Sequence, residues 1–321
     1  MTIEPAAPGE PRRPHGPRDP GDAWVVAPSG ERYWGRFGAA GLLALDRDRG
    51  VLLQHRAAWS HFGDTWGLPG GARHQNEPAR DAALREAEEE AGVPTDAIRP
   101  RLISVFDLGY WSYTTLVGDV GTPFEPMIGD PESRELAWVP VKDVAHRPLH
   151  PGFAASWQRL RPLLTTRPAV LVDAANVVGS VPDGWWRDRV GATERLLDRI
   201  ARLAANGVAA DALGLPEDVW FPEWSVVVEG QACRATDRPG VRVIRAGGSG
   251  DDTIVAEANR LATQQLALTV VTSDRGLAAR VRPSGRSSGT ASGHSPDVRV
   301  VGSSWLRTLI DEPGARRHSR P

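Results

Sequence analysis

Residues 70–93 read GGARHQNEPARDAALREAEEEAGV, and they decide the fold expected for the first half of the chain. Pro78 suits the first turn of a helix, where its missing N–H loses no hydrogen bond. Gly92 suits the opposite end, because glycine adopts the left-handed conformation that commonly terminates a helix. The stretch therefore predicts a glycine-rich loop followed by a helix over residues 78–91.

Three glutamates of this expected helix share one face. Glu86 lies three residues before Glu89 and four before Glu90, so helical geometry stacks the three carboxylates. Like charges in this arrangement destabilise a bare helix by roughly a few tenths of a kcal/mol per pair. A divalent cation would reverse that effect, since Mg²⁺ prefers carboxylate oxygens, and Arg85 can orient a carboxylate or bind phosphate. The alternative interpretation is a solvated, glutamate-rich helix surface.

The spacing of the whole stretch favours the metal site. It follows the pattern G-x5-E-x7-R-E-U-x-E-E-x-G-U, with U apolar, at Gly71, Glu77, Arg85, Glu86, Glu89, Glu90 and Gly92. This pattern resembles the Nudix box, the signature of the Nudix hydrolases, and the resemblance extends over residues 33–165. Two positions depart from it. Asn76 stands where glycine is common, although asparagine tolerates a left-handed turn, and Ala87 fills a slot usually held by a larger apolar residue.

The resemblance implies an α/β/α sandwich with a mixed sheet, and an enzyme that cleaves a pyrophosphate bond in a nucleoside diphosphate-linked substrate. It implies Mg²⁺ or Mn²⁺ as cofactor, and the ligands carried over are Glu86, Glu89, Glu90 and the carbonyl of Gly71. Arg85 would orient the glutamates, and Glu77 would be structural. The general base stays open between a glutamate of the box and a carboxylate elsewhere.

The second half of the chain has a different pattern of apolar segments. Residues 169–311 alternate short apolar strands with helices, which is typical of a parallel sheet covered on both faces. Acidic residues follow several of the strands, namely Asp173, Glu229, Asp251, Asp252 and Asp274. Because the carboxyl ends of parallel strands line the functional crevice, we expect these carboxylates to converge and bind Mg²⁺ or Mn²⁺. Taken singly, each aspartate could instead cap a helix or form a turn.

Together these acidic motifs resemble those of the NYN branch of the PIN-like nucleases. The matching segments are Asp173–Asn176 (DAAN), Gly250–Ile254 (GDDTI) and Thr272–Arg275 (TSDR). The resemblance implies a PIN-like parallel α/β (Rossmann-like) domain with metal-dependent ribonuclease activity, and RNA as its partner. It implies metal ligands at Asp173, Asp251, Asp252 and Asp274, support from Asn176, and a weaker acidic position at Glu229.

Composition narrows the class of protein. The chain has 321 residues, about the size of two ordinary domains. Its single cysteine, Cys233, excludes an internal disulfide framework and a zinc site built on several thiolates, and favours a reducing cytoplasm. No apolar run approaches the roughly 20 residues of a spanning helix, so we expect no membrane partner.

The expected organisation has five parts. They are a disordered Pro/Arg-rich tail over 1–32, a Nudix domain over 33–165, a linker over 166–168, an NYN/PIN-like domain over 169–311 and a tail over 312–321. A Ser/Gly-rich surface loop is predicted over 283–296. The predicted activity is Mg²⁺-dependent pyrophosphate hydrolysis joined to a ribonuclease. The alternative is a nucleotide-sensing regulator in which one domain is inert and the C-terminal domain binds RNA.

Overall fold

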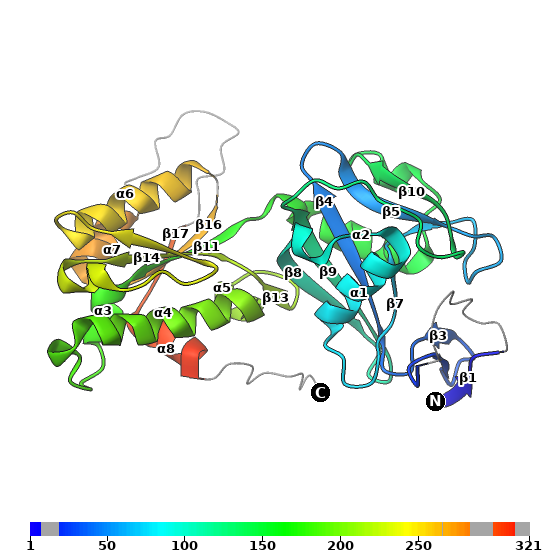
Figure 1. The fold of residues 1–321 in the computed structure, drawn as a ribbon, viewed down its shortest axis with the longest axis horizontal. Coiled ribbons are helices and arrows are strands. Elements are labelled where there is room, and N and C mark those ends of the chain that lie inside the picture. Colours follow the sequence, from blue (N-terminus) through cyan, green and yellow to red (C-terminus); the bar gives the residue numbers. More distant parts are fainter. Residues whose placement is uncertain (8–18, 265, 283–297, 312–321) are drawn as a thin grey trace. The chain divides into compact units, whose positions relative to one another are not determined.

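The computed structural model describes residues 1–7, 19–264, 266–282 and 298–311 (Figure 1). The chain forms two compact units. The first comprises Met1–Leu164 and Pro216–Val219, and the second comprises Thr165–Leu215 and Trp220–Pro321. The expected loop over 283–296 and tail over 312–321 lie outside the described residues. Within those residues, none of the helices combines the length and the apolar character needed to cross a bilayer.

A mixed sheet forms the centre of the first unit. Its main strands lie in the order β10 (Ser133–Val139), β5 (Gly50–Arg56), β4 (Ala39–Asp46), β9 (Ser112–Val120) and β8 (Ile98–Asp107). The pair β4–β9 is parallel, whereas β4–β5, β5–β10 and β8–β9 are antiparallel. Two short strands, β6 (Trp66–Gly67) and β7 (Gly70–Ala72), pair with β5 and β4. The predicted mixed sheet is therefore confirmed.

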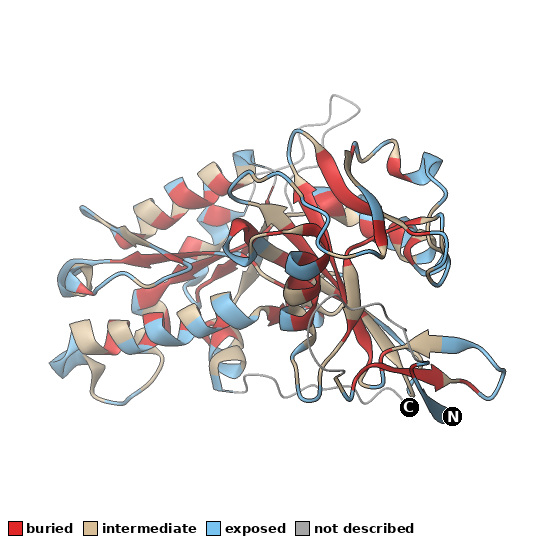
Figure 2. Cartoon of the chain, turned by 45° about the vertical axis from the view of Figure 1, so that its right-hand side comes forward, coloured by how far each residue is buried: buried red, intermediate tan, exposed pale blue. Residues whose placement is uncertain are grey.

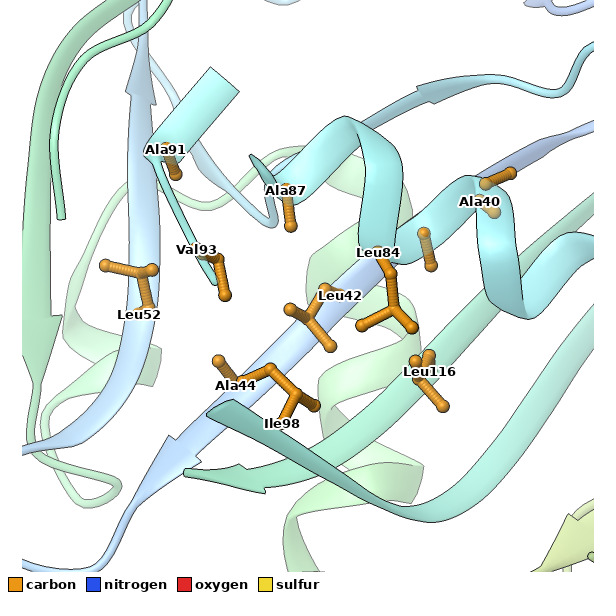
Figure 3. Packing of buried hydrophobic residues seen from close by; sticks show 12 residues of the cluster. Ala40, Leu42, Ala44, Leu52, Leu84, Ala87, Ala91, Val93, Ile98 and Leu116 are labelled. Atoms are coloured by element: carbon orange, nitrogen blue, oxygen red, sulfur yellow. The ribbon is translucent and has the colours of Figure 1, made fainter. Parts of the chain in front are cut away.

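Helix α1 (Ala79–Ala91) covers one face of this sheet. Figure 3 shows Leu84 and Ala87 of the helix directed at Leu42 of β4 and Leu116 of β9, all buried. Small residues let the helix approach the strands closely, which explains why Ala87 serves where a larger residue is common. Gly92 ends the helix in the left-handed conformation at φ 63°, as its position in the sequence predicted.

Helix α2 (Pro151–Leu160) closes the first unit, followed by a 3-10 turn over Arg161–Thr165. The His150 side chain caps α2, because its Nδ1 accepts a hydrogen bond from the Gly152 N–H at 3.1 Å. Burial, together with the nearby Arg56 and His61, lowers the pKa of His150 to about 4. The native state therefore holds this imidazole neutral at the pH where the unfolded chain begins to protonate it.

We expect this cap to make the stability of the protein pH-dependent. The stabilising contribution is complete above about pH 6.5, the unfolded pKa, and is lost as the pH falls toward 4. His150→Asn keeps a capping side chain but has no proton to gain. Thermal unfolding between pH 7 and pH 5 should show a smaller decrease in midpoint for the variant than for the wild type. Equal decreases would contradict this assignment.

Three further strands lie near the N-terminus, where the sequence predicted disorder. They are β1 (Thr2–Pro5), β2 (Ala23–Val26) and β3 (Arg32–Trp34), and they form an antiparallel sheet in that order. The prediction of a disordered tail over 1–32 is thus wrong for these strands, while residues 8–18 lie outside the described part. Figure 2 shows buried positions in the strands near the N-terminus. Trp24 and Val25 of β2 are buried, and this apolar burial offsets the entropy cost of ordering the strands.

The second unit is built on five parallel strands. Their order is β15 (Val241–Arg245), β14 (Glu223–Val228), β11 (Pro168–Asp173), β16 (Ala267–Val271) and β17 (Val298–Val301). In chain order the strands run 3-2-1-4-5, so the direction of winding reverses between β11 and β16. Ligands of open α/β sheets bind at this reversal, at the carboxyl ends of the strands. The predicted parallel α/β sheet is confirmed, although Pro168 of the expected linker already belongs to β11.

Helices cover both faces of this sheet (Figure 1). The longer ones are α4 (Arg189–Asn206), α6 (Gly250–Thr263), α7 (Arg275–Val281) and α8 (Ser303–Asp311). The short helices are α3 (Ala174–Gly179) and α5 (Ala210–Leu213). Two short strands, β12 (Val208–Ala209) and β13 (Val219–Trp220), are not part of the five-stranded sheet, and β13 is the neighbour of β8. Helices α6 and α7 contact each other, and α3, α4 and α8 form the second group.

One segment of the later sequence belongs to the first unit. Residues Pro216–Val219 lie along β8, where the Asp218 carboxylate accepts a hydrogen bond from the Val105 N–H at 2.7 Å. The Asp218 N–H donates to the Ile103 carbonyl at 3.2 Å. Glu217 pairs with Arg159 of α2 at 3.5 Å. The first unit is therefore discontinuous in sequence. The expected domain boundary at residue 165 leaves out the segment Pro216–Val219.

Candidate functional site

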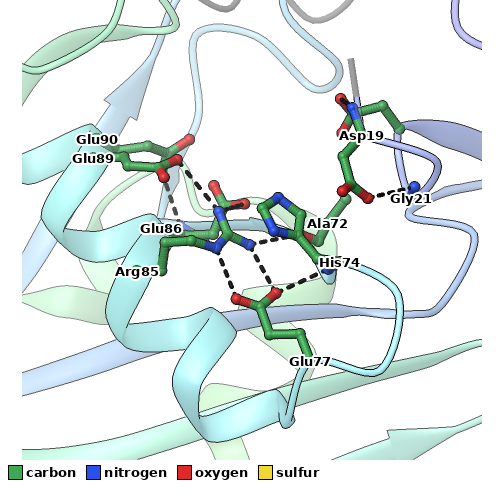
Figure 4. A network of polar contacts seen from close by, with 11 residues as sticks. Asp19, Gly21, Ala72, His74, Glu77, Arg85, Glu86, Glu89 and Glu90 are labelled. Atoms are coloured by element: carbon green, nitrogen blue, oxygen red, sulfur yellow. Dashed lines mark hydrogen bonds and ion pairs between the residues drawn. The ribbon is translucent and has the colours of Figure 1, made fainter. Parts of the chain in front are cut away.

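Arg85 of α1 is the centre of a polar network that joins this helix to the glycine-rich loop before it (Figure 4). Its Nε and Nη2 donate to the two Glu77 carboxylate oxygens at 2.8 and 3.0 Å. Its Nη1 donates to Glu86 at 2.7 Å and to Glu89 at 3.3 Å, and its Nη2 donates to the Ala72 carbonyl at 3.0 Å. A planar guanidinium with five donors can make all these contacts at once, so Arg85 ties the loop to the glutamates.

Glu77 joins the loop after β7 to Arg85 of α1. Its carboxylate accepts both Arg85 hydrogen bonds and also the His74 N–H at 2.8 Å. Burial alone would raise the pKa of Glu77, but Arg85 and the His74 N–H lower it below its usual range. Asn76 adopts a left-handed conformation at φ 63°, so the tolerance expected of this asparagine is confirmed.

Glu86 and Glu90 are buried carboxylates on the inner side of α1. Glu90 accepts a hydrogen bond from the Gly70 N–H at 2.9 Å. Burial raises the pKa of Glu90 well above its usual range, and the neighbouring charges of Glu86 and Asp130 raise it further. Glu89 lies one turn away with half of its side chain exposed. The site therefore brings together buried negative charges that a cation would stabilise.

The glutamates are not assembled around a metal in this arrangement. Over the described ranges, no group of three or more His, Cys, Asp or Glu side chains is placed to hold an ion. Arg85 engages Glu86 and Glu89, while Glu90 faces Gly70. These side chains nevertheless fit Mg²⁺ or Mn²⁺, because both ions prefer carboxylate oxygens as ligands. Two of the carboxylates, those of Glu86 and Glu90, are buried beside the loop.

Position 71 must be glycine because the Glu86 carboxylate leaves no room there for a side chain. A Cβ at this position would stand 2.6 Å from the Glu86 Oε2. We expect Gly71→Ala to displace that carboxylate and to lower kcat by about 100-fold, the size of effect seen when a catalytic electrostatic contact is lost. Gly67→Ala is the matched control, since the nearest atom to its added Cβ lies 3.7 Å away. Steady-state kinetics of both variants test this, and similar activities in the two would contradict it.

Three residues near the glutamates carry no sequence signal. Burial raises the pKa of Tyr113, whose hydroxyl lies against Gly41, and Glu90 adds to that effect. Burial also raises the pKa of Asp130, which accepts the backbone N–H groups of its loop. Arg56 is the nearby positive charge that acts on both groups. All three reach the site from β9, β5 and the loop before β10, so only the folded chain places them together.

The second unit holds a pocket of about 180 Å³ at the winding reversal. It is lined by Asp173, Ala175, Asn176, Val227, Glu229, Gly250, Asp251, Ile254 and Asp274. Five of these are predicted site residues, which the fold brings together from the ends of β11, β14 and β16 and the start of α6.

Hydrogen bonds hold the pocket carboxylates in place. Asp173 accepts from the Asn176 N–H at 3.0 Å and from the Thr272 hydroxyl at 2.9 Å. Burial raises the pKa of Asp173, and Asp251 and Glu229 raise it further. Glu229 accepts the Gly250 N–H at 3.0 Å. The pocket is therefore another concentration of negative charge.

Two predicted ligands have other roles in the structure. Asp252 is exposed and pairs with Arg280, outside the pocket, because residues adjacent on a helix point about 100° apart. Asp274 lines the pocket but also caps α7, accepting the Leu277 N–H at 2.8 Å. Asn176 accepts the Ser273 N–H at 2.8 Å, so it braces the loop after β16.

Comparison with known proteins identifies the first half of the chain. The family model described as the NUDIX domain matches residues 35–160. A Mycobacterium tuberculosis protein, provisionally named 8-oxo-dGTP diphosphatase 3, is 49% identical over 166 residues, covering 49% of this chain and 76% of the relative. The chain belongs to the Nudix hydrolase family. The family predicted from residues 70–93 is thereby confirmed, and the protein is a pyrophosphohydrolase of that family.

Two further Nudix proteins are similar to this chain. A Bifidobacterium longum protein, described as a nucleoside triphosphate pyrophosphatase/Nudix hydrolase fusion, is 41% identical over 148 residues, covering 44% of this chain and 31% of the relative. The crystal structure of a Nudix hydrolase from M. smegmatis, RenU, is 48% identical, with a TM-score of 0.42, covering 45% of this chain and 95% of that one. The residues that match the NUDIX family model lie within the first unit.

Proposed function

We propose that the first unit hydrolyses a nucleoside triphosphate bearing a purine base, breaking one pyrophosphate bond by attack of water. The observation that carries the proposal is the buried pair Glu86 and Glu90 beside the Arg85-anchored loop. The relative named as an 8-oxo-dGTP diphosphatase supports this substrate class, and it makes 8-oxo-dGTP the first compound to test.

Nudix hydrolases generally use a divalent metal, and the residues of this site fit one. Glu86, Glu89, Glu90 and the Gly71 carbonyl would hold Mg²⁺ or Mn²⁺. When bound, the ion supplies charge for the phosphate oxygens and lowers the pKa of a bound water.

The protein's own groups perform the remaining tasks. Arg85 orients Glu86 and Glu89 through its hydrogen bonds and holds Gly71 in register through Ala72. Glu90 and Asp130 are carboxyl groups whose pKa burial raises. Because Glu90 would hold the metal, Asp130 is the carboxylate elsewhere that could accept the proton of the attacking water.

A mass-spectrometric turnover screen of the full chain with Mg²⁺ tests this function. It compares 8-oxo-dGTP, dGTP, ADP-ribose and RNA with a 5′-triphosphate, and it follows release of pyrophosphate or monophosphate. We expect the highest kcat/KM for a purine nucleoside triphosphate. Turnover of ADP-ribose alone would overturn the substrate class, and tight binding without turnover of any compound would favour the nucleotide-sensing regulator.

A second candidate function concerns the second unit. We infer that its acidic pocket, lined by Asp173, Glu229, Asp251 and Asp274, binds a divalent metal and cleaves RNA, as the NYN/PIN-like resemblance implies. The specific support is the position of this pocket at the winding reversal of a parallel sheet, where such folds bind ligands. Incubating the full chain with single-stranded RNA and Mn²⁺ tests the idea, and intact RNA would contradict it.

A further inference from the structure

A buried glutamine lies on β5 among apolar residues. Gln54 is fully buried and shares a face of the strand with Leu52, which packs in the core against α1. Its Nε2 donates a hydrogen bond to the Ser133 hydroxyl of β10 at 2.7 Å. Its Oε1 is buried and has no hydrogen-bond partner among the residues that the structure describes. Because an unpaired buried oxygen costs folding free energy, the presence of this amide calls for a role beyond packing.

The hydrogen bond of Gln54 leads to Asp130 in the loop before β10. The backbone N–H groups of Glu132 and Ser133 donate to Asp130 Oδ1 at 2.8 and 3.2 Å. The Ser133 hydroxyl donates to the same oxygen at 3.5 Å, the upper limit for a hydrogen bond. A hydroxyl has one hydrogen, and because Gln54 donates to the Ser133 oxygen, that hydrogen is directed to Asp130. All three bonds end on Oδ1, which holds the carboxylate in one orientation and allows Oδ2 to accept from another group.

The loop that carries Asp130 is fixed against the end of α1. The Gly129 N–H donates to the Glu90 carbonyl at 3.0 Å, and a Cβ on Gly129 would collide with the Glu89 carbonyl. Burial raises the pKa of Glu90, and the charges of Glu86 and Asp130 raise it further, so these carboxyl groups are neighbours. Gln54 is therefore connected, through one hydroxyl, to a carboxylate beside the glutamates of the box.

We propose that Gln54 and Ser133 are positioning residues of the hydrolase, which hold Asp130 Oδ2 toward the water that attacks the substrate. This inference rests on the proposed function, in which Asp130 accepts a proton. As the water oxygen forms its bond to phosphorus, its proton passes to Asp130. The bridging P–O bond breaks, and its electron pair stays on the departing phosphate or pyrophosphate. Gln54 is fully buried and cannot touch the nucleotide, so it acts on the rate of this step and not on binding.

Kinetics and stability of Gln54→Met test the role of the amide. Methionine keeps the length of the side chain and removes its hydrogen-bonding groups. We expect the kcat of the full chain for 8-oxo-dGTP with Mg²⁺ to fall by about 10- to 100-fold, the cost of a misplaced proton acceptor, and KM to stay within about twofold. The midpoint of thermal unfolding should equal that of the wild type or exceed it, because methionine brings no unpaired oxygen into the core.

The matched control lies directly opposite Gln54 on β10. Leu136 is its partner in the strand register and packs against the same core. Leu136→Met conserves volume and changes no hydrogen-bonding group, so its kcat should stay within about twofold of the wild type.

A double-mutant cycle separates an effect through Asp130 from a general one. Adding Gln54→Met to Asp130→Asn should change kcat by less than about twofold, because the carboxylate that Gln54 orients is then already absent. Ser133→Ala should lower kcat by about the same factor as Gln54→Met, and the two substitutions together should cost no more than either alone.

The possible failures are distinguishable. An unchanged kcat in Gln54→Met overturns the inference while leaving the hydrolase intact. Losses that multiply in Gln54→Met/Asp130→Asn also overturn it, because Gln54 would then act on the site in general. If Gln54→Met does not fold, the cycle of Ser133→Ala with Asp130→Asn decides by the same criterion. If the wild type turns over no nucleotide, the proposed function fails and the inference fails with it.

Discussion

Glu90→Gln is expected to lower kcat by about 100- to 1,000-fold, the cost of losing a central electrostatic group in a catalytic site. Glu90 is buried beside Glu86 and hydrogen-bonded to Gly70, so the substitution preserves the shape of the site and removes its charge. Pyrophosphate release from the substrate found in the screen, measured at several Mg²⁺ concentrations, gives the value.

The control for this variant lies on the same helix. Glu88→Gln changes an exposed glutamate of α1. Its carboxylate accepts a hydrogen bond from the Thr95 hydroxyl at 3.2 Å. Its kcat should stay within about twofold of the wild type, since surface charges on helices contribute little. The metal-free Glu90→Gln protein should unfold at the same temperature as the wild type or higher, because it no longer buries a repelling carboxylate. Full activity in Glu90→Gln, or equal losses in both variants, would refute the role of Glu90.

Asp173→Asn is expected to abolish RNA cleavage by the second unit, with a loss of about 100-fold or more. Asp173 is a buried carboxylate of the pocket, at the end of β11 and next to the winding reversal. The amide oxygen can still accept the Asn176 N–H, and the amide NH2 can donate to the Thr272 hydroxyl, so the fold should survive. Gel analysis of single-stranded RNA incubated with Mn²⁺ measures the loss.

Asp252→Asn is the matched control for the second unit. Asp252 follows Asp251 directly in sequence but is exposed and paired with Arg280. Its replacement should leave cleavage unchanged, while nucleotide hydrolysis by the first unit should be unaffected by either substitution. If Asp252→Asn lost as much cleavage as Asp173→Asn, the metal set implied by the sequence motif would be correct and the pocket assignment wrong.

Elements with strong local signals were predictable from the sequence. Helix α1 lies between Pro78 and Gly92, which mark its ends by backbone chemistry alone, and its glutamates share a face by helical spacing. The hairpin of β4 and β5 follows from two apolar runs around a polar turn, which Asp46 closes by accepting the Asp48 and Arg49 N–H groups. At both places, residues close together in the sequence are enough to determine the local structure.

The remaining parts depend on contacts between distant residues. Strand β3 is three residues long and is stabilised by its pairing with β2, so it has no periodicity to detect. Asp130 lies in a loop without a motif, and only the fold brings it near Glu90. Asp252 was predicted as a ligand from its place in the GDDTI motif, whereas the structure has it exposed and paired with Arg280, because adjacent helical residues point about 100° apart.

The contribution of Pro216–Val219 to the first unit has a consequence for how the chain can be divided. Cutting after residue 165 would separate β8 from the segment that accepts and donates hydrogen bonds along its outer edge. The exposed edge would then offer unpaired backbone groups to other chains, a known route to aggregation. An insertion or a protease cut near Asp218 would therefore disturb the Nudix unit from a position about fifty residues beyond its apparent end.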